Sequence, residues 1–122
     1  MNNREQAVQV LAEKGAVVIK CNGGSMKPLI FPREAIHLIK VDPSVLKVGD
    51  AVFVRVGGAL QVHKIGAIDK DRYKITNWSD WGNSWVGSHC IYGLCVQVED
   101  RVVVSEDEMN KRRAQSHTTS KT

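Results

Sequence analysis

Three side chains of this sequence, Ser25, His63 and Asp80, are of the types that together carry out nucleophilic acyl transfer. A serine hydroxyl is a poor nucleophile unless a nearby base takes its proton, and imidazole can do so near neutral pH. A carboxylate on the far imidazole nitrogen would then fix the tautomer of the histidine. Their presence alone is weak evidence, because most chains of this size contain some Ser, His and Asp. The segments that carry them must therefore supply the argument.

Ser25 lies in a turn that follows an apolar run. Residues 21–28 read CNGGSMKP and come directly after AVVI. Paired glycines reach backbone angles with positive φ at little steric cost, and proline then fixes the exit. On these residues alone the segment is either an ordinary turn or a loop that exposes Ser25.

Strand patterns dominate the rest of the chain. Residues 4–13 place apolar side chains on one side of a short helix that Gly15 ends. The runs at 16–21 and 35–41 predict strands on either side of the Ser25 turn. The other predicted strands are 51–56, 59–68, 73–76, 90–98 and 101–104, with a Gly57-Gly58 hairpin turn between the first two. This pattern predicts a compact, mainly β fold of several antiparallel strands with a short N-terminal helix.

The length of 122 residues fits one domain. We divide it into an N-terminal helix at 1–15, a catalytic β domain at 16–104, and a short helix with a flexible basic tail at 105–122. The content of 43% hydrophobic and 25% charged residues is ordinary for a soluble protein. No apolar run could span a bilayer, and the N-terminus lacks the apolar core of a secretory signal. We expect a soluble, cytoplasmic protein without a transmembrane anchor.

The net charge of +4 comes from the C-terminal end, where Lys111, Arg112, Arg113 and Lys121 stand in a segment without acids. The rest of the chain is neutral. A basic end rich in Ser and Thr is typical of a solvated, poorly ordered tail, and no recognition helix or stacking motif is visible. We therefore expect no nucleic-acid binding. Such a tail would attract acidic partners or a membrane surface only weakly, and in a salt-dependent way.

The three cysteines, Cys21, Cys90 and Cys95, are an odd number without paired spacing. This predicts free, buried thiols in a reducing compartment. Cys90 and Cys95 on one strand would face opposite sides, so a metal site that they form with His89 is not expected. No metal or other cofactor is expected.

The sequences of two segments resemble motifs of a known clan of serine peptidases. GGSMKPLI, followed by VGDAVFVRVGGALQVHKIGAI, is similar to the clan that includes type I signal peptidases and the self-cleaving repressors of the SOS response. There the nucleophile lies in a motif like GxSMxPT, a strand introduced by GD follows, and the next long strand carries the catalytic base. WVGSHCIYGLCV resembles the closing segment VPxxxIxGxV. The resemblance runs from about residue 16 to 98.

This resemblance implies His63 as the base. The clan uses lysine in bacterial signal peptidases and SOS repressors, where the strand reads like VKRL. It uses histidine in the branch of the endoplasmic reticulum, archaea and some spore formers, where the strand reads like HRVV; here the segment is VHKI. Lys64 is the alternative, but lysine must be strongly desolvated to lose its proton near pH 7. Successive strand residues face opposite ways, so only one of the pair points at Ser25. The alternatives without a catalytic role are that His63 is a packed strand residue and that Ser25 is an ordinary turn residue.

Asp80 is the candidate third member. The histidine branch usually has an acid in a GDxN-like stretch after the base strand, whereas this chain reads ITNWSDWGN, without the GD pair. Asp80 is the only carboxylate between Tyr73 and Glu99. A Ser25-His63 dyad without it is the alternative. The tryptophans of this region cover the end of the β core, which we favour, or form a cleft wall; they are Trp78, Trp81 and Trp85.

The turn itself would hold the oxyanion of the tetrahedral intermediate. The backbone N–H of Ser25 is the expected donor, helped by the tight turn at Gly23-Gly24. Signal peptidases often add a serine hydroxyl two residues before the nucleophile, where this chain has Gly23. In this clan Met26 supports the loop and lines the substrate cleft, and Pro28 stiffens the exit.

The sequence thus predicts a soluble, signal peptidase-like serine endopeptidase that acts on a peptide or protein substrate. The substrate would pair as an added strand at a sheet edge near residues 16–24, with small residues favoured on the acyl side. The segment before Ser25 looks too short for self-cleavage of the repressor kind. The alternative is a peptide-binding or regulatory module with little or no turnover, favoured by the missing GD pair and by Gly23. The sequence leaves the oligomeric state open.

Overall fold

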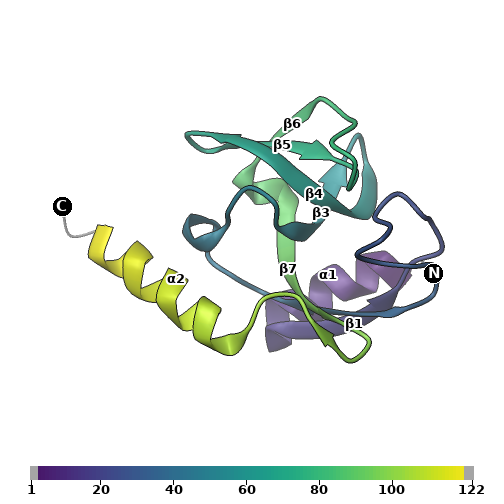
Figure 1. The fold of residues 1–122 in the computed structure, drawn as a ribbon, viewed down its shortest axis with the longest axis horizontal. Helices are drawn as coiled ribbons and strands as arrows, with labels where there is room; N and C mark the ends of the chain where they lie inside the picture. Colours follow the sequence, from purple (N-terminus) through teal and green to yellow (C-terminus); the bar gives the residue numbers. More distant parts are fainter. Residues whose placement is uncertain (1–2, 120–122) are drawn as a thin grey trace.

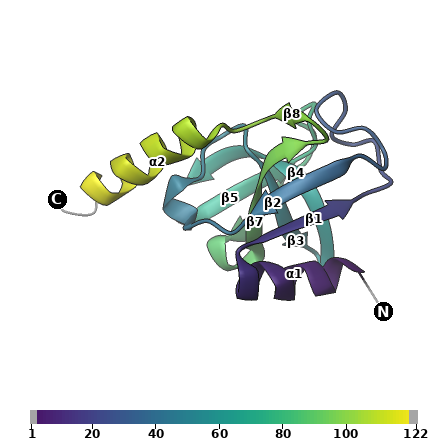
Figure 2. The same ribbon diagram turned by 90° about the horizontal axis from the view of Figure 1, so that it is seen from below.

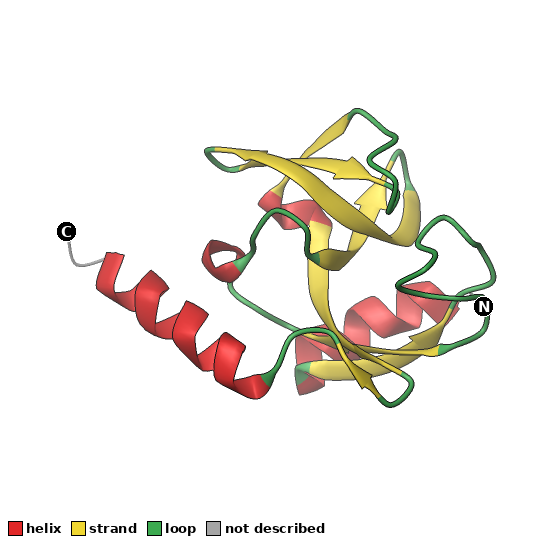
Figure 3. Ribbon diagram, viewed as in Figure 1, coloured by secondary structure: helices red, strands yellow, loops and turns green. Residues whose placement is uncertain are grey.

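The structure of this chain is a computed structural model that describes residues 3–119. An antiparallel sheet forms the body, in the order β1-β2-β7-β3-β4-β5-β6, with β8 paired to β7 (Figures 1 and 3). Its strands are β1 Ala16–Lys20, β2 Ala35–Ile39, β3 Ala51–Val56, β4 Ala59–Asp69, β5 Arg72–Thr76, β6 Ser84–Gly87, β7 Ile91–Val98 and β8 Arg101–Val102. The helices are α1 Asn3–Lys14 and α2 Glu106–Thr119, with short 3-10 turns η1 Pro43–Val45 and η2 Ser88–Cys90. The mainly β fold with a short N-terminal helix is confirmed.

Helix α1 covers one side of the sheet and lies along β1 (Figure 2). Its buried residues Ala7 and Leu11 stand one turn apart, so both face the sheet. Gly15 ends the helix with a φ of 82°, and its N–H donates to the Leu11 carbonyl at 2.9 Å. This left-handed C-terminal residue suits glycine and turns the chain directly into β1.

The core has two parts, one on each face of the central strand β3. Its segment AVFV is fully buried, with Phe53 facing α1 and the nucleophile loop, and Val52 and Val54 facing η1, β5 and α2. A strand covered on both faces reads as a continuous apolar run instead of an alternating one. The pairing of β3 with β4 across the Gly57-Gly58 turn, both glycines with positive φ, matches the predicted hairpin. The second strand of this hairpin, β4, carries His63 of the site described below.

Helix α2 is longer than the predicted short helix, and it includes much of the segment expected to be a poorly ordered tail. Ser105 Oγ accepts a hydrogen bond from the Glu108 N–H at 3.0 Å, and Met109 is buried in the core. Arg112, counted above as a solvated charge, is instead buried and paired with Asp50. The segment is thus helical up to Thr119 and not a poorly ordered tail, and the expected solvation is wrong for Arg112, whereas Lys111 and Arg113 are exposed as expected. Helix α2 is stabilised by tertiary contacts, which the composition of the segment does not reveal.

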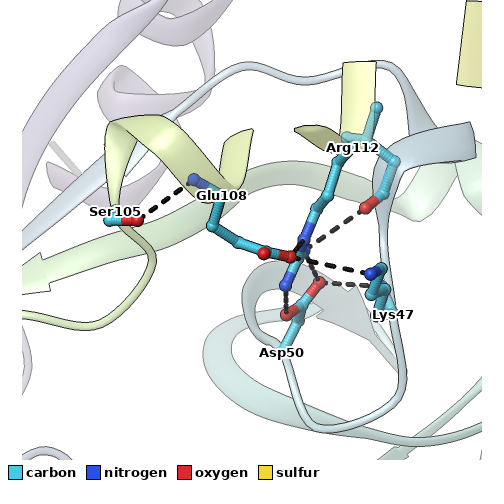
Figure 4. A network of polar contacts seen from close by, with 6 residues as sticks. Lys47, Asp50, Ser105, Glu108 and Arg112 are labelled. Atoms are coloured by element: carbon cyan, nitrogen blue, oxygen red, sulfur yellow. Dashed lines mark hydrogen bonds and ion pairs between the residues drawn. The ribbon is translucent and has the colours of Figure 1, made fainter. Parts of the chain in front are cut away.

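Figure 4 shows how Arg112 ties α2 to the turn that introduces β3. Its Nη1 and Nη2 donate to the two carboxylate oxygens of Asp50 at 2.7 and 3.1 Å, and its Nε donates to Glu108 at 2.8 Å. Asp50 also accepts from the Lys47 N–H at 2.8 Å. Both members of the central pair are more than nine-tenths buried. Asp50 thus joins the GD turn to the C-terminal helix.

Two other sequence expectations need correction. No strand is predicted between residues 73–76 and 90–98, but this stretch contains β6, which pairs with β5. Its polar and aromatic residues carry no alternating pattern, because β6 is an edge strand with two exposed positions. The three thiols are free, as expected, yet only Cys95 is buried, whereas Cys21 and Cys90 are partly exposed.

Candidate active site

The nucleophile loop, residues 21–34, joins β1 to β2 without regular secondary structure. Met26 and Ile30 are buried in the core beneath it, and the Ile30 N–H donates to the Met26 carbonyl at 3.0 Å. The N–H of Arg33 closes the loop on the Cys21 carbonyl at 2.7 Å. The loop is therefore anchored by its apolar residues, while its neighbouring residue Ser25 remains exposed. Pro28, expected to stiffen the exit, is also exposed.

Ser25 lies directly against His63. Its Oγ is 3.0 Å from Nε2 of the imidazole, within hydrogen-bond reach. His63 belongs to β4 and is opposite Val52 of the buried strand β3. The imidazole is thus carried by a strand that pairs with the buried strand β3, and the hydroxyl is brought to it by the loop.

The surroundings of His63 favour its neutral form. The side chain is half-buried, and this burial lowers the pKa of the imidazole below its ordinary value. A neutral imidazole with its proton on Nδ1 leaves Nε2 free to accept a proton from Ser25. Among the described residues, Nδ1 makes no hydrogen bond. His63 is therefore suited to act as a base at neutral pH, without an acid to orient it.

Asp80 contacts Lys64 instead. Its Oδ1 is 2.6 Å from Nζ of Lys64, which also donates to the Trp78 carbonyl at 2.9 Å. The Lys64 side chain is only 13% exposed. The described contacts thus bring Ser25 and His63 together. Asp80, on the loop that follows β5, pairs instead with Lys64 of β4. Lys64, the alternative base, contacts Asp80 and the Trp78 carbonyl, whereas the side-chain partner of Ser25 is His63.

The Asp80–Lys64 pair is connected to the nucleophile loop through the backbone of Trp78. The Trp78 N–H donates to the Ser25 carbonyl at 3.0 Å, and the Trp78 carbonyl is the acceptor for Lys64. The loop that follows β5 is closed by Asn77, whose side chain accepts from the N–H groups of Ser79 and Trp81 at 2.9 Å. Sequence reasoning missed this clamp. The available signals were an Asn followed by polar turn residues, and a lysine beside the base.

The expected oxyanion donor, the N–H of Ser25, lies at the start of the turn and not after a tight glycine turn, because the turn spans residues 25–29 and neither Gly23 nor Gly24 has a positive φ. The N–H of Ser25 has no acceptor within the described part of the chain, so it is available to a developing negative charge. A Cβ atom placed on Gly23 would meet no other atom within 4 Å. Gly23 therefore leaves space at the position where the signal peptidases that this segment resembles often carry a hydroxyl.

A pocket of about 180 Å³ opens beside the two reactive side chains. Its lining residues are Arg4, Cys21, Gly23, Ser25, Met26, Ile30, Ile36, Gln61, Val62 and His63. A second, larger hollow of about 510 Å³ lies between α1 and β1 and shares Arg4 with the first. Strand β1 ends the sheet on this side, since it pairs only with β2 among the described strands. An open strand edge and a pocket thus meet at Ser25.

The three tryptophans take different positions, and none lines this pocket. Trp78 packs against the core and lies beneath Nζ of Lys64, 5.1 Å from its ring centre. Trp81 is 78% exposed and Trp85 is 37% exposed. Only Trp78 thus covers the end of the core, as favoured above for all three.

Comparison of the chain with protein-family models and with curated proteins gave no match. Within residues 3–119, no helix is long and apolar enough to cross a membrane. In the same range, no three His, Cys, Asp or Glu side chains are grouped so that they could hold a metal ion.

Proposed function

We propose that this protein is a signal peptidase-like serine endopeptidase with a Ser25-His63 dyad. The observation that carries the proposal is the 3.0 Å contact between Ser25 Oγ and His63 Nε2. A nucleophile within hydrogen-bond reach of a base, beside a pocket and a free backbone N–H, is the arrangement that acyl transfer requires. The GGSMKP and VHKI segments, which suggested these two residues, support the same assignment.

In the proposed reaction, Ser25 Oγ attacks the carbonyl carbon of the scissile peptide bond while its proton passes to His63 Nε2. The N–H of Ser25 stabilises the oxyanion. The imidazolium then donates its proton to the leaving amine, and an ester remains on Ser25. Water, deprotonated by the same imidazole, hydrolyses the ester and restores the hydroxyl.

The substrate would bind in an extended conformation along β1. The N–H and C=O groups on the open edge of this strand can form a ladder with an added segment. Residues Ala16–Lys20 lead directly into the nucleophile loop, so a paired segment would run toward Ser25. A peptide or protein with an accessible, unfolded segment is the class of substrate that fits this edge.

A serine-directed fluorophosphonate probe tests the proposal. We expect labelling of the unchanged protein at Ser25, none in Ser25→Ala, and a loss of at least about a thousandfold in rate in His63→Ala. Ser88→Ala is the matched control, because Ser88 lies on η2 outside the pocket lining, and it should label normally. If the folded, unchanged protein is not labelled, the enzyme assignment fails and a peptide-binding module is the better description.

A further inference from the structure

The pocket beside Ser25 has an apolar floor and an amide in its lining. Met26, Ile30 and Ile36 are buried beneath it, and Gln61 is the lining residue that carries an amide side chain. This amide makes no hydrogen bond within the described part of the chain. An amide without a partner in a largely apolar pocket is a group that a ligand can use.

The other polar side chains of the lining already have partners. Ser25 and His63 share the 3.0 Å contact of the dyad. Arg4 is engaged within the fold, since it donates to the Leu60 carbonyl at 2.7 Å and contacts the Cys21 thiol. Among the described contacts, Gln61 is therefore the polar residue of this lining whose side chain is open to a substrate.

Gln61 stands close to the reactive hydroxyl. It lies two positions before His63 on β4, so both side chains face the same side of the strand, about 7 Å apart along it. His63 in turn meets Ser25, and all three residues line the same pocket. A substrate residue whose side chain enters this pocket therefore lies next to the scissile bond.

A side chain that fills the pocket takes water away from the Gln61 amide. The amide has an N–H₂ donor and a carbonyl acceptor, and a polar group that loses water without gaining a partner costs free energy. The floor offers no partner, because its side chains are apolar. An aliphatic substrate side chain would thus leave the amide unpaired, whereas a hydroxyl can both donate to it and accept from it. A charged side chain would lose its own hydration against the same floor.

We propose that Gln61 is a specificity-determining residue, which selects Thr or Ser over an aliphatic residue at the substrate position that enters this pocket. Thr fits best, because its hydroxyl pairs with the amide while its methyl group packs on the apolar floor. The inference rests on the proposed function, since it names the substrate residue beside the bond that is cut. It narrows the expectation of small residues to small residues with a hydroxyl.

The first experiment measures binding of fluorescent nonapeptides to the Ser25→Ala protein, which lacks the nucleophile. The peptides consist of Ala and Gly with terminal Lys residues, and one position at a time is Thr, Val or Asn. We expect one position at which Thr binds about tenfold more tightly than Val, the size of one neutral hydrogen bond. Salt should not change this preference, because neither partner is charged. Equal affinity for Thr and Val at every position, a stronger preference for Asn, or no binding at all would overturn the proposal.

Substitution of Gln61 then identifies the group responsible. Gln61→Met keeps the length of the side chain and removes both polar atoms, so it should abolish the preference for Thr or reverse it toward Val. Gln61→Ala is a second variant with the same expected loss. Gln9→Met is the matched control, because Gln9 is exposed on α1 and lines neither hollow, and it should change nothing. Circular dichroism checks that each variant is folded. A Thr preference that survives in either folded Gln61 variant contradicts the assignment.

Cleavage of the same peptides by the unchanged protein separates the two proposals. Cleavage next to the Thr position, with Thr preferred over Val, supports both. Cleavage without that preference leaves the peptidase standing and removes the role of Gln61. Thr-selective binding without cleavage or probe labelling keeps the hydroxyl-binding pocket and removes the peptidase.

Discussion

The Asp50–Arg112 pair and the Ser25–His63 pair each have one member on or directly beside the β3–β4 hairpin, yet they differ in burial and in hydrogen bonding. Asp50 and Arg112 are buried, and each makes several hydrogen bonds. Ser25 is exposed, and it shares a single described side-chain hydrogen bond with the half-buried His63. The first pair uses its hydrogen-bonding groups within the fold, so its role is structural. The second pair keeps two hydrogen-bonding groups without a described partner, Nδ1 of His63 and the N–H of Ser25, and such groups are the kind that a reaction uses.

The largest effect expected from this difference is on stability. Arg112→Ala leaves the buried Asp50 carboxylate without its counter-ion and should lower the free energy of unfolding by about 3–5 kcal/mol. Chemical denaturation measures it. Arg113→Ala, an exposed neighbour, should change the same quantity by less than about 0.5 kcal/mol. His63→Ala should cost less than about 1.5 kcal/mol. Equal losses in Arg112→Ala and His63→Ala would break the distinction between the two pairs.

The second effect is on pH dependence. Because burial lowers the pKa of His63, the base stays neutral to a lower pH than an exposed histidine would. The rate of Ser25 labelling should be constant from neutral pH down to below about 6.5, and then fall about tenfold per pH unit as Nε2 becomes protonated. A midpoint above about 6.5 would instead indicate a carboxylate against the imidazole.

The third effect concerns the oxyanion donors. Gly23→Ser adds a hydroxyl where the structure leaves space, so the labelling rate should rise by up to about tenfold. Gly23→Ala fills the same space without a donor and should give no increase. Equal rates in the two variants would show that the Ser25 N–H acts without help from position 23.

The smallest effect is expected at Asp80. Since Asp80 contacts Lys64, Asp80→Asn should weaken only the clamp on the nucleophile loop and reduce the labelling rate by less than about tenfold. A true triad aspartate would cost about ten thousandfold when so replaced. A loss of that size would show that Asp80 reaches Nδ1 of His63 during the reaction. Lys64→Met should reproduce the smaller effect.

The sequence predicted the parts of the fold that depend on local pattern. The buried run at β3, the Gly57-Gly58 turn and the helix ended by Gly15 each carry their own signal, and each is present. Strand β6 was missed because an exposed edge strand with tryptophans has no alternating pattern. The docking of α2 was missed because it depends on Asp50 and Arg112, which are distant in the chain and meet only after folding.

The same division applies to the site. The contact of Ser25 with His63 could be predicted from the sequence motifs, and from the fact that His63 and Lys64 face opposite sides of one strand. The partner of Asp80 could not be predicted, because it depends on how the loop after β5 closes. Alternation along β4 puts Lys64 on the other side from His63, and the loop carries Asp80 to that side.

The open edge of β1 also limits how this protein can be handled and stored. Val18 is 53% exposed on this edge, and Lys20 is the only charged side chain of the strand. An edge that is free to accept a foreign segment is equally free to accept the β1 of another copy, or a segment from a partly unfolded chain. If β1 binds the substrate as proposed, self-pairing at high concentration would occupy the surface that leads to Ser25. A charged substitution at Val18 would improve solubility at the expense of the ladder that guides a substrate.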